Sequence, residues 1–203
     1  MQKPKLDKIN TIYENHFVNL YDLKYQNDFH YYLASRKDKE NLVCIRKEIT
    51  PDAITCIVIT HIDDEDKMLL FYEYRYPIGE FVLSVPSGLC EKEEQPIMSA
   101  VKREIYEETG IMVSDKDSIE IMNPLLFSTP GFSDESTAFV CVRLHAQNFK
   151  LTNKENTGAE KVKEYTLVNK EEAKVILKDG LDHHGFYYSI ATWVALSYFA
   201  YHI

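Results

Sequence analysis

Residues 103–111 of this chain read REIYEETGI, and this stretch decides the fold because it joins a helix to a cluster of acids. Apolar residues recur at helical spacing over residues 96–109, and Gly110 marks the end of that helix. On a helical wheel with about 100° per residue, Val101 and Ile105 lie on the apolar face. The segment therefore predicts a helix that packs one face against a core.

Three glutamates of this helix lie at or beside its apolar face. Glu108 falls within the buried sector of the wheel, whereas Glu104 and Glu107 fall at its edge. Like charges three or four residues apart cost a helix about a few tenths of a kcal/mol per pair, so the cluster needs extra protons or a bound cation. Oxygen ligands on a rigid helix suit Mg²⁺ or Mn²⁺. The alternative interpretation is a solvated acidic helix face.

The charge of the chain limits its partners. The 203 residues include 23 Lys and Arg against 32 Asp and Glu, which gives a net charge of −9. This sign repels a nucleic-acid backbone and an anionic bilayer, so we expect neither as a partner. A divalent cation would reconcile an acidic protein with an anionic substrate, because Mg²⁺ commonly takes further ligands from substrate phosphates. The pattern points to phosphoryl or nucleotidyl transfer.

Outward from this helix, strand and helix patterns alternate. Segments rich in β-branched and aromatic residues predict strands, and helical spacing predicts two further helices. The predicted strands cover residues 16–25, 29–36, 54–59, 68–74, 81–85, 119–127, 137–144 and 162–168, and the two further helices cover residues 170–178 and the C-terminal stretch. The fold class is therefore mixed α/β, with helices on both faces of a sheet.

The N-terminal segment forms a separate β appendage in this interpretation. Its two predicted strands are separated by residues 26–28, whose sequence QND is typical of a hairpin turn. We expect a small antiparallel appendage over residues 1–48 and the main domain over residues 49–203.

Cysteine spacing and the two ends of the chain bear on its compartment. The four cysteines lie far apart with no CxxC pair, so free thiols in a reducing cytoplasm are expected. The first ten residues, MQKPKLDKIN, precede no apolar stretch of the signal-peptide type.

Residues 185–203 contain no Asp, Glu, Lys or Arg and could nearly span a bilayer. Their tyrosines, and the lack of a basic flank, favour a buried or dimer-facing helix instead.

The order of residues around the acidic helix resembles a known motif. Gly88, Glu94 and residues 103–111 resemble the Nudix box, GX5EX7REUXEEXGU with U an aliphatic residue, which marks hydrolases of nucleoside diphosphates linked to another moiety. From Arg103 onward the motif matches at every specified position. The first half departs from it, because eight residues rather than seven separate Glu94 from Arg103. We interpret the extra residue as a loop insertion before the helix.

The resemblance extends to both sides of the box. Residues 72–77 (YEYRYP) and 128–135 (STPGFSDE) look like segments of the ADP-ribose pyrophosphatase branch. This branch implies a Nudix-type α/β/α sandwich with a mixed sheet, a homodimer formed through the appendage, and hydrolysis of ADP-ribose to AMP and ribose 5-phosphate. Another nucleotide sugar, a dinucleotide or CDP-choline is the alternative substrate. A non-catalytic nucleotide sensor of the same fold is the alternative from a different functional class.

By this resemblance, the residues of the box take separate roles. Glu104 and Glu108 would be the principal ligands of two or three Mg²⁺ or Mn²⁺ ions, with Glu107 assisting and the backbone carbonyl of Ser87 completing the shell. Arg103 would orient the carboxylates. Water would attack one phosphorus of the diphosphate in line, and the ions would neutralise the charge that develops on the phosphoryl oxygens.

Three further residues complete the expected site. Glu160, at the end of a polar loop, is the nearest match to the glutamate that serves this branch as the general base, and Glu164 is the alternative. Arg75 is expected to grip the diphosphate or the terminal ribose, and a surface ion pair with Glu73 is the competing interpretation. Glu135 is expected to help seat the terminal sugar or a metal ion.

Overall fold

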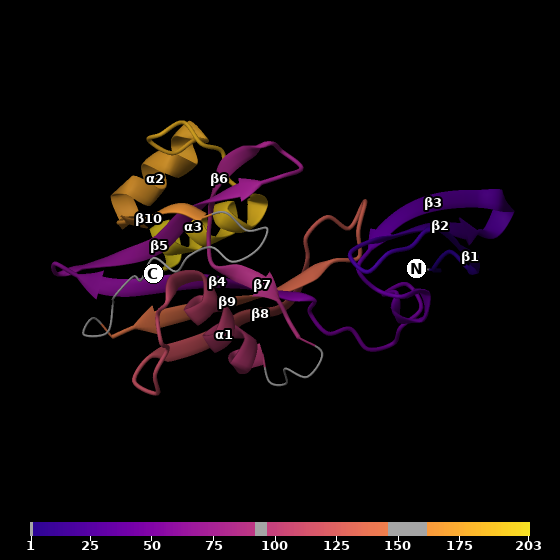
Figure 1. Cartoon of the computed structure of the whole chain (residues 1–203), viewed down its shortest axis with the longest axis horizontal. Helices are drawn as coiled ribbons and strands as arrows, with labels where there is room; N and C mark the ends of the chain where they lie inside the picture. The colour runs from indigo at the N-terminus through magenta and orange to yellow at the C-terminus, as the bar shows by residue number, and fades with distance from the viewer. Residues whose placement is uncertain (1, 92–96, 146–161) are drawn as a thin grey trace. The chain divides into compact units, whose positions relative to one another are not determined.

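The computed structural model describes residues 2–91, 97–145 and 162–203, and its largest element is a seven-stranded sheet (Figure 1). The main path runs β10-β5-β4-β9-β8, while β6 pairs with β5 and β7 pairs with β4. The strands are β4 (Ala53–Ile62), β5 (Glu65–Arg75), β6 (Glu80–Ser84), β7 (Ser87–Leu89), β8 (Ser118–Phe127), β9 (Ser136–Leu144) and β10 (Val162–Val168). The strands predicted in this part of the chain are confirmed, and only the short β7 was not expected.

Strands β4 and β5 form the centre of the sheet because both are almost continuous apolar runs. They pair in antiparallel fashion, with Ile59 opposite Met68, and both of these side chains are buried. The turn between them contains Asp63 and Asp64, whose φ angles are 55° and 62°. Aspartate tolerates this left-handed region better than most residues do, so the acidic turn sequence fixes where the hairpin reverses.

Helices cover both faces of the large sheet, as Figure 1 shows. Helix α1 (Ile97–Thr109) packs in a core cluster that contains Leu69 of β5. Helices α2 (Lys170–Asp179) and α3 (Ile190–His202) pack in a second cluster that contains Leu70. Because successive side chains of a strand point to opposite faces, these two neighbouring leucines serve the two layers. The expected α/β/α sandwich with a mixed sheet is confirmed.

Helix α2 begins with a capping box. The side chain of Asn169 accepts a hydrogen bond from the Glu172 backbone N–H at 2.9 Å, and the Glu172 carboxylate accepts one from the Asn169 N–H at 2.8 Å. We expect Asn169→Ala to lower the free energy of unfolding by about 1 kcal/mol, because an N-terminal N–H of the helix loses its acceptor. Urea denaturation measures this. Asn169→Asp keeps the acceptor and should change stability far less, and equal losses in both variants would contradict the capping role.

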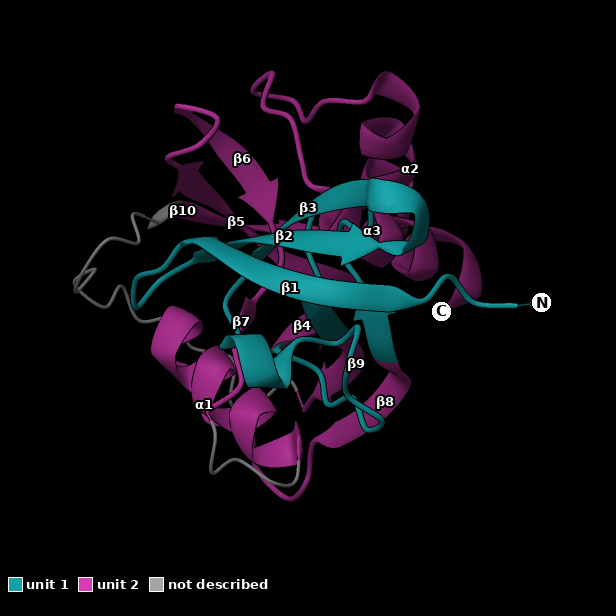
Figure 2. Cartoon of the chain, turned by 90° about the vertical axis from the view of Figure 1, so that its right-hand side faces the viewer, with its two compact units in different colours: residues 1–52, 125–137 teal, residues 53–124, 138–203 magenta. Residues whose placement is uncertain are grey.

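Residues 1–52 and 125–137 form the first of two compact units, drawn in teal in Figure 2. Its sheet has three antiparallel strands in the order β1-β2-β3. The elements are β1 (Leu6–Tyr13), β2 (Asn19–Tyr25), the 3-10 turn η1 (Gln26–Asp28), β3 (Phe29–Ser35) and the 3-10 turn η2 (Lys39–Asn41). The predicted hairpin is confirmed. Strand β1 was not expected, because Ile9 is its one buried residue and gives no periodic signal.

Backbone contacts explain why residues 125–137 belong to the first unit. The Ala34 N–H donates to the carbonyl of Phe132 at 3.0 Å, and the Val43 N–H donates to the Asp134 carboxylate at 3.1 Å. The second unit comprises residues 53–124 and 138–203. The domain boundary between residues 48 and 49 remains a prediction, since compactness alone does not show which part folds independently.

The uncharged C-terminal stretch forms helix α3, which has one buried and one exposed side. Leu196 and Phe199 are fully buried, whereas Ile190 and Trp193 are exposed. Within the described ranges, no helix combines the length and apolar character that a membrane crossing requires.

The four cysteines form no disulfide.

Candidate active site

The three glutamates of helix α1 are buried to different extents. Glu104 is only 8% exposed and lies among the buried residues of the helix, beside Val101 and Ile105. Glu108 is half-buried and Glu107 is exposed. The wheel placed Glu108 deeper than Glu104, and this ranking was wrong. A wheel treats the opposing surface as uniform, whereas the opposing strand has a local gap.

Gly88 of β7 provides that gap. A Cβ atom added to Gly88 would lie 2.0 to 2.2 Å from the Glu104 carboxylate atoms, far closer than van der Waals contact allows. Strand β7 is held in place by pairing with β4, where Gly88 lies opposite Ile54. The carboxylate of Glu104 therefore occupies the space that any other residue at position 88 would fill.

Arg103 holds two of the three glutamates. Its Nη1 donates to Glu104 Oε1 at 2.7 Å and to Glu107 Oε2 at 2.9 Å. Its Nη2 donates to the backbone carbonyl of Leu89 at 2.9 Å. Because Leu89 ends β7, one guanidinium connects the helix, two carboxylates and the strand through charge-assisted hydrogen bonds. The orienting role of Arg103 in catalysis remains a prediction.

Glu108 is positioned from two sides. The backbone N–H of Ser87 donates to Glu108 Oε2 at 3.0 Å, and the hydroxyl of Tyr165 donates to the backbone carbonyl of Glu108. The ring of Tyr165 lies edge-on to Phe71, with 6.1 Å between ring centroids. Sequence reasoning missed Tyr165, because it lies 57 residues from its partner and no motif links them.

We expect Tyr165→Phe to weaken both stability and turnover. The variant leaves a carbonyl in the last turn of α1 without this donor, which should lower the free energy of unfolding by about 1 kcal/mol. A shifted Glu108 should reduce kcat severalfold with little change in KM. Urea denaturation and steady-state kinetics measure the two effects. Tyr201→Phe, at an exposed position of α3, is the control, and a Tyr165→Phe variant that behaves like this control would contradict the positioning role.

A buried thiol lies close to the two deeper carboxylates. Cys56 of β4 is fully buried, and its backbone N–H donates to the Pro86 carbonyl at 2.7 Å. Burial, followed by the negative charges of Glu108 and Glu104, raises the pKa of this thiol well above its usual range. Cys56 therefore stays protonated and is a packing residue rather than a nucleophile.

The donor set of this site has the chemistry that a hard divalent cation requires. The donors are carboxylate and backbone oxygens, which Mg²⁺ and Mn²⁺ prefer. Across the parts of the chain that the structure describes, no three His, Cys, Asp or Glu side chains converge closely enough to hold a metal ion. Instead, Arg103 binds Glu104 and Glu107, and the Ser87 N–H binds Glu108. A cation here would share these carboxylates with the Arg103 guanidinium and the Ser87 N–H.

The structure places the other predicted site residues in separate surroundings. Arg75, at the end of β5, forms an ion pair with Glu73, with 2.7 Å between Nη2 and Oε2. Glu135 forms an ion pair with Arg36 at 2.9 Å, within the first compact unit. Glu160 and Glu94 lie outside the described residues, as does the predicted polar loop at 147–159. The roles of these residues remain predictions.

Comparison with known proteins assigns the fold and the motif to one family. The NUDIX domain model matches residues 50–189, a range that includes helix α1 and strands β4 to β10. The chain belongs to the Nudix family. A crystal structure of an ADP compounds hydrolase aligns with a TM-score of 0.62 over 97% of this chain and 93% of that chain, at 16% identity. This likeness shows the same fold.

Individual relatives match a shorter part of the chain. An ADP-ribose pyrophosphatase of Bacillus subtilis is 32% identical over 85 residues, and a methanol dehydrogenase activator of Bacillus methanolicus is 35% identical over 86 residues, each match covering 42% of both chains. An ADP-sugar pyrophosphatase of Mus musculus is 30% identical over 104 residues, which are 51% of this chain and 45% of that one. Each match therefore spans less than half of the relative's length.

Proposed function

We propose that this chain hydrolyses the diphosphate bond of a nucleoside diphosphate linked to another moiety, and that ADP-ribose is its substrate. The observation that carries the proposal is the arrangement of α1 against β7. There the Glu104 carboxylate is seated over Gly88, and Glu108 is held at the Ser87 N–H. The names of the Bacillus subtilis and Mus musculus relatives support an ADP-containing substrate.

The same proposal includes two or three Mg²⁺ or Mn²⁺ ions. Glu104 and Glu108 would be the principal ligands, with Glu107 and the Ser87 carbonyl completing the set. When bound, the ions supply positive charge to the phosphoryl oxygens and lower the pKa of a coordinated water. The seat over Gly88 supports this role for Glu104, because a ligand that is already fixed needs little ordering when a cation arrives.

The remaining groups of the chain would act on the substrate and on the attacking water. Arg103 would keep the carboxylates of Glu104 and Glu107 in place, because its guanidinium donates charge-assisted hydrogen bonds to both. Glu160 would accept the proton of the attacking water. Arg75 would contact the diphosphate with the guanidinium that pairs with Glu73 in this structure. Glu135 would hydrogen-bond the terminal sugar.

Two observations favour this function over the alternatives. The three acids of the helical half of the box, Glu104, Glu107 and Glu108, are all present, which favours catalysis over a sensor that only binds a nucleotide. Among substrates, the relatives' names favour ADP-ribose and ADP-sugars over CDP-choline. A panel of ADP-ribose, other nucleotide sugars, dinucleotides and CDP-choline, assayed with Mg²⁺, tests the substrate. Tight binding of ADP-ribose without turnover would identify a sensor instead.

Removal of divalent cations is expected to abolish hydrolysis without unfolding the chain. Arg103 offsets part of the negative charge of Glu104 and Glu107 through its two ion pairs, so we expect the fold to survive loss of the cation. With EDTA, we expect no detectable turnover of ADP-ribose and a melting temperature within about 3 °C of the Mg²⁺ form. Added Mg²⁺ should restore activity. Undiminished turnover in EDTA would contradict the metal requirement.

A homodimer formed through the N-terminal sheet is part of the proposal. The first unit exposes several large apolar side chains, which is typical of an interaction surface. They include Ile12, Tyr13, Phe17, Phe29 and Tyr32. Light scattering of the full chain measures the oligomeric state, and a monomer at micromolar concentration would contradict the proposed homodimer.

A further inference from the structure

A groove of about 620 Å³ is lined by strand β10, helix α2 and the loop that follows α2, all within the second compact unit. Strand β10 contributes residues 166–168, and the loop contributes residues 181–183. The apolar residues of the groove include Val168, Val175, Ile176 and Leu181. Val175 is 55% exposed. The groove therefore leaves apolar surface of α2 open to solvent.

Strand β10 forms an open edge of the large sheet. It pairs with β5 on one side, and in the parts of the chain that the structure describes no strand pairs with its other side. About half of the backbone N–H and C=O groups of an edge strand point away from its neighbour. The opposite edge strand, β8, contains Pro124, and proline commonly protects such edges, whereas β10 (VKEYTLV) contains none. The edge of β10 can therefore accept another strand.

The groove gives access to the backbone of this edge. Successive side chains of a strand point to opposite faces. Accordingly, Val168 packs in the cluster that contains α2 and α3, whereas Leu167 packs against the cluster that contains α1. Because Leu167 also lines the groove, it does so through its main chain. Hydrogen-bonding groups of a strand thus lie beside apolar side chains of a helix, an arrangement that suits an extended peptide.

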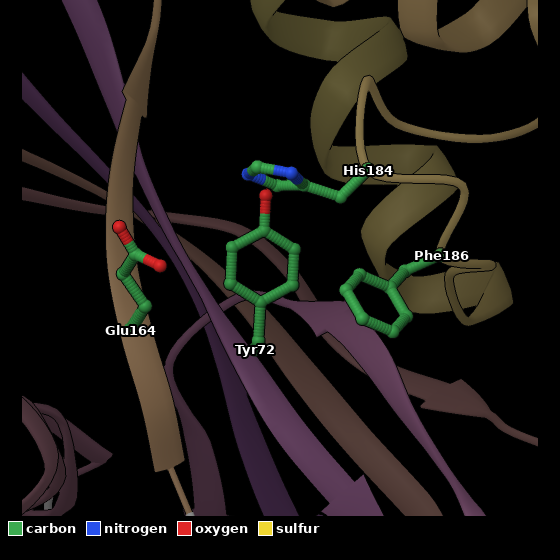
Figure 3. A pocket seen from close by; sticks show the side chains of 4 residues that line it. All are labelled: Tyr72, Glu164, His184 and Phe186. Atoms are coloured by element: carbon green, nitrogen blue, oxygen red, sulfur yellow. The ribbon is translucent and has the colours of Figure 1, made fainter.

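The loop that completes the groove is fixed by its own contacts. The carboxylate of Asp182 accepts hydrogen bonds from the backbone N–H groups of His184 at 3.0 Å and Phe186 at 2.8 Å, and from the Tyr72 hydroxyl at 2.6 Å. The Tyr72 ring packs against the other two rings, and Figure 3 shows Glu164 of β10 on its free side. A wall that is already ordered costs an incoming ligand little conformational entropy. The groove is therefore preformed.

The charge of the groove favours a basic partner. Four acidic residues and two lysines line it, namely Glu171, Glu172, Asp179, Asp182, Lys174 and Lys178. Lys174 is already paired with Glu171, with 2.5 Å between Nζ and Oε1. The whole chain has a net charge of −9, so the long-range field has the same sign as the local one. Both attract a positively charged segment.

We propose that this groove binds an extended, basic peptide segment of a partner protein, which adds to the open edge of β10 as a further strand. Apolar side chains of that segment would lie against Val168 and Val175, and its basic side chains would face Glu172 and Asp179. The proposal does not rest on the proposed hydrolysis, because binding here requires none of the α1 carboxylates.

Fluorescence anisotropy of a dye-labelled peptide, titrated with the full chain, tests the proposal. The probe is the amidated peptide Lys-Thr-Val-Thr-Val-Thr-Lys, which as a strand has lysine and valine on one face and threonine on the other. We expect saturable binding with a Kd below about 1 mM. Absence of saturable binding would overturn the proposal.

Two methylated forms of this peptide separate strand addition from simple apolar contact. One form carries N-methyl groups on the valine amides, and the other carries them on the threonine amides. Because only alternate amides of an added strand face its neighbour, one form should bind at least about tenfold more weakly and the other should bind like the parent peptide. Unchanged affinity in both forms, or an equal loss in both, would overturn the proposal.

A variant assigns the binding to the groove. Val175→Lys places a positive charge on the apolar wall and should weaken peptide binding at least about tenfold, with the oligomeric state unchanged. Met112→Lys, at an exposed position after α1, is the matched control and should bind like the parent. Circular dichroism confirms the fold of both. Unchanged affinity of Val175→Lys would overturn the proposal. So would loss of self-association in Val175→Lys when the parent binds no peptide, because the groove would then hold a second copy of the chain.

Discussion

Glu108→Gln is expected to reduce the hydrolysis of ADP-ribose by about a thousandfold or more while the fold stays intact. Glutamine keeps the size of the side chain and an oxygen that can accept the Ser87 N–H bond, which is 3.0 Å long in the parent. The variant therefore removes only the negative charge. Since a metal ligand at this position must be anionic to hold the cation, activity should fall far more than stability.

Steady-state kinetics at saturating Mg²⁺, together with thermal denaturation, measure this contrast. Glu120→Gln, at an exposed carboxylate of β8, is the matched control and should retain full activity. Glu107→Gln should lie between the two, because Glu107 is exposed and bound to Arg103. A Glu108→Gln variant with full activity would remove the metal assignment, whereas loss of the fold would show that the charge serves stability instead.

Gly88→Ala is expected to reduce activity at least about a hundredfold, with a fall in melting temperature of about 5 °C. The added Cβ would lie 2.0 to 2.2 Å from the Glu104 carboxylate, so that carboxylate must leave its seat. Carboxylates at the end of a flexible side chain can move, which limits the loss of stability. The displaced Glu104 would no longer be placed to bind the cation, which makes the loss of activity large.

Gly131→Ala is the control for a generic effect of glycine replacement. Its Cβ would meet nothing closer than the Tyr31 hydroxyl, at 3.8 Å, so its melting temperature should match that of the parent. Isothermal titration of Gly88→Ala with Mg²⁺ separates the two causes of lost activity. If this variant bound Mg²⁺ as tightly as the parent, the inference that the missing side chain of Gly88 lets Glu104 bind the ion would be contradicted.

The fold and the centre of the site could be predicted because both depend on local patterns. Nearly continuous apolar runs located β4 and β5, and the motif located Arg103, Glu104 and Glu108 on one helix. The relative depth of the two glutamates could not be predicted from the helix, because it depends on a glycine in a strand that precedes the helix. A helical wheel gives the angular positions of residues around one helix, but it gives no information about the surface that the helix packs against.

Contacts that join distant parts of the chain were beyond the reach of sequence patterns. The Tyr165 bond to Glu108 spans 57 residues, and the ion pair of Arg36 with Glu135 spans 99. The pair of Arg75 and Glu73 was anticipated as a competing interpretation, because residues two apart share one face of a strand. Sequence reasoning therefore succeeded where partners lie within one element.

The guanidinium of Arg103 gives the chain an internal counter-ion. Many small metalloproteins are unfolded until their ion arrives, because the binding of the ion supplies the free energy of folding. Here the repulsion between Glu104 and Glu107 is already offset by a group of the same polypeptide. Under the proposed metal-dependent activity, folding would not have to wait for the ion, and a chain deprived of magnesium would stay folded but inactive until the ion returned.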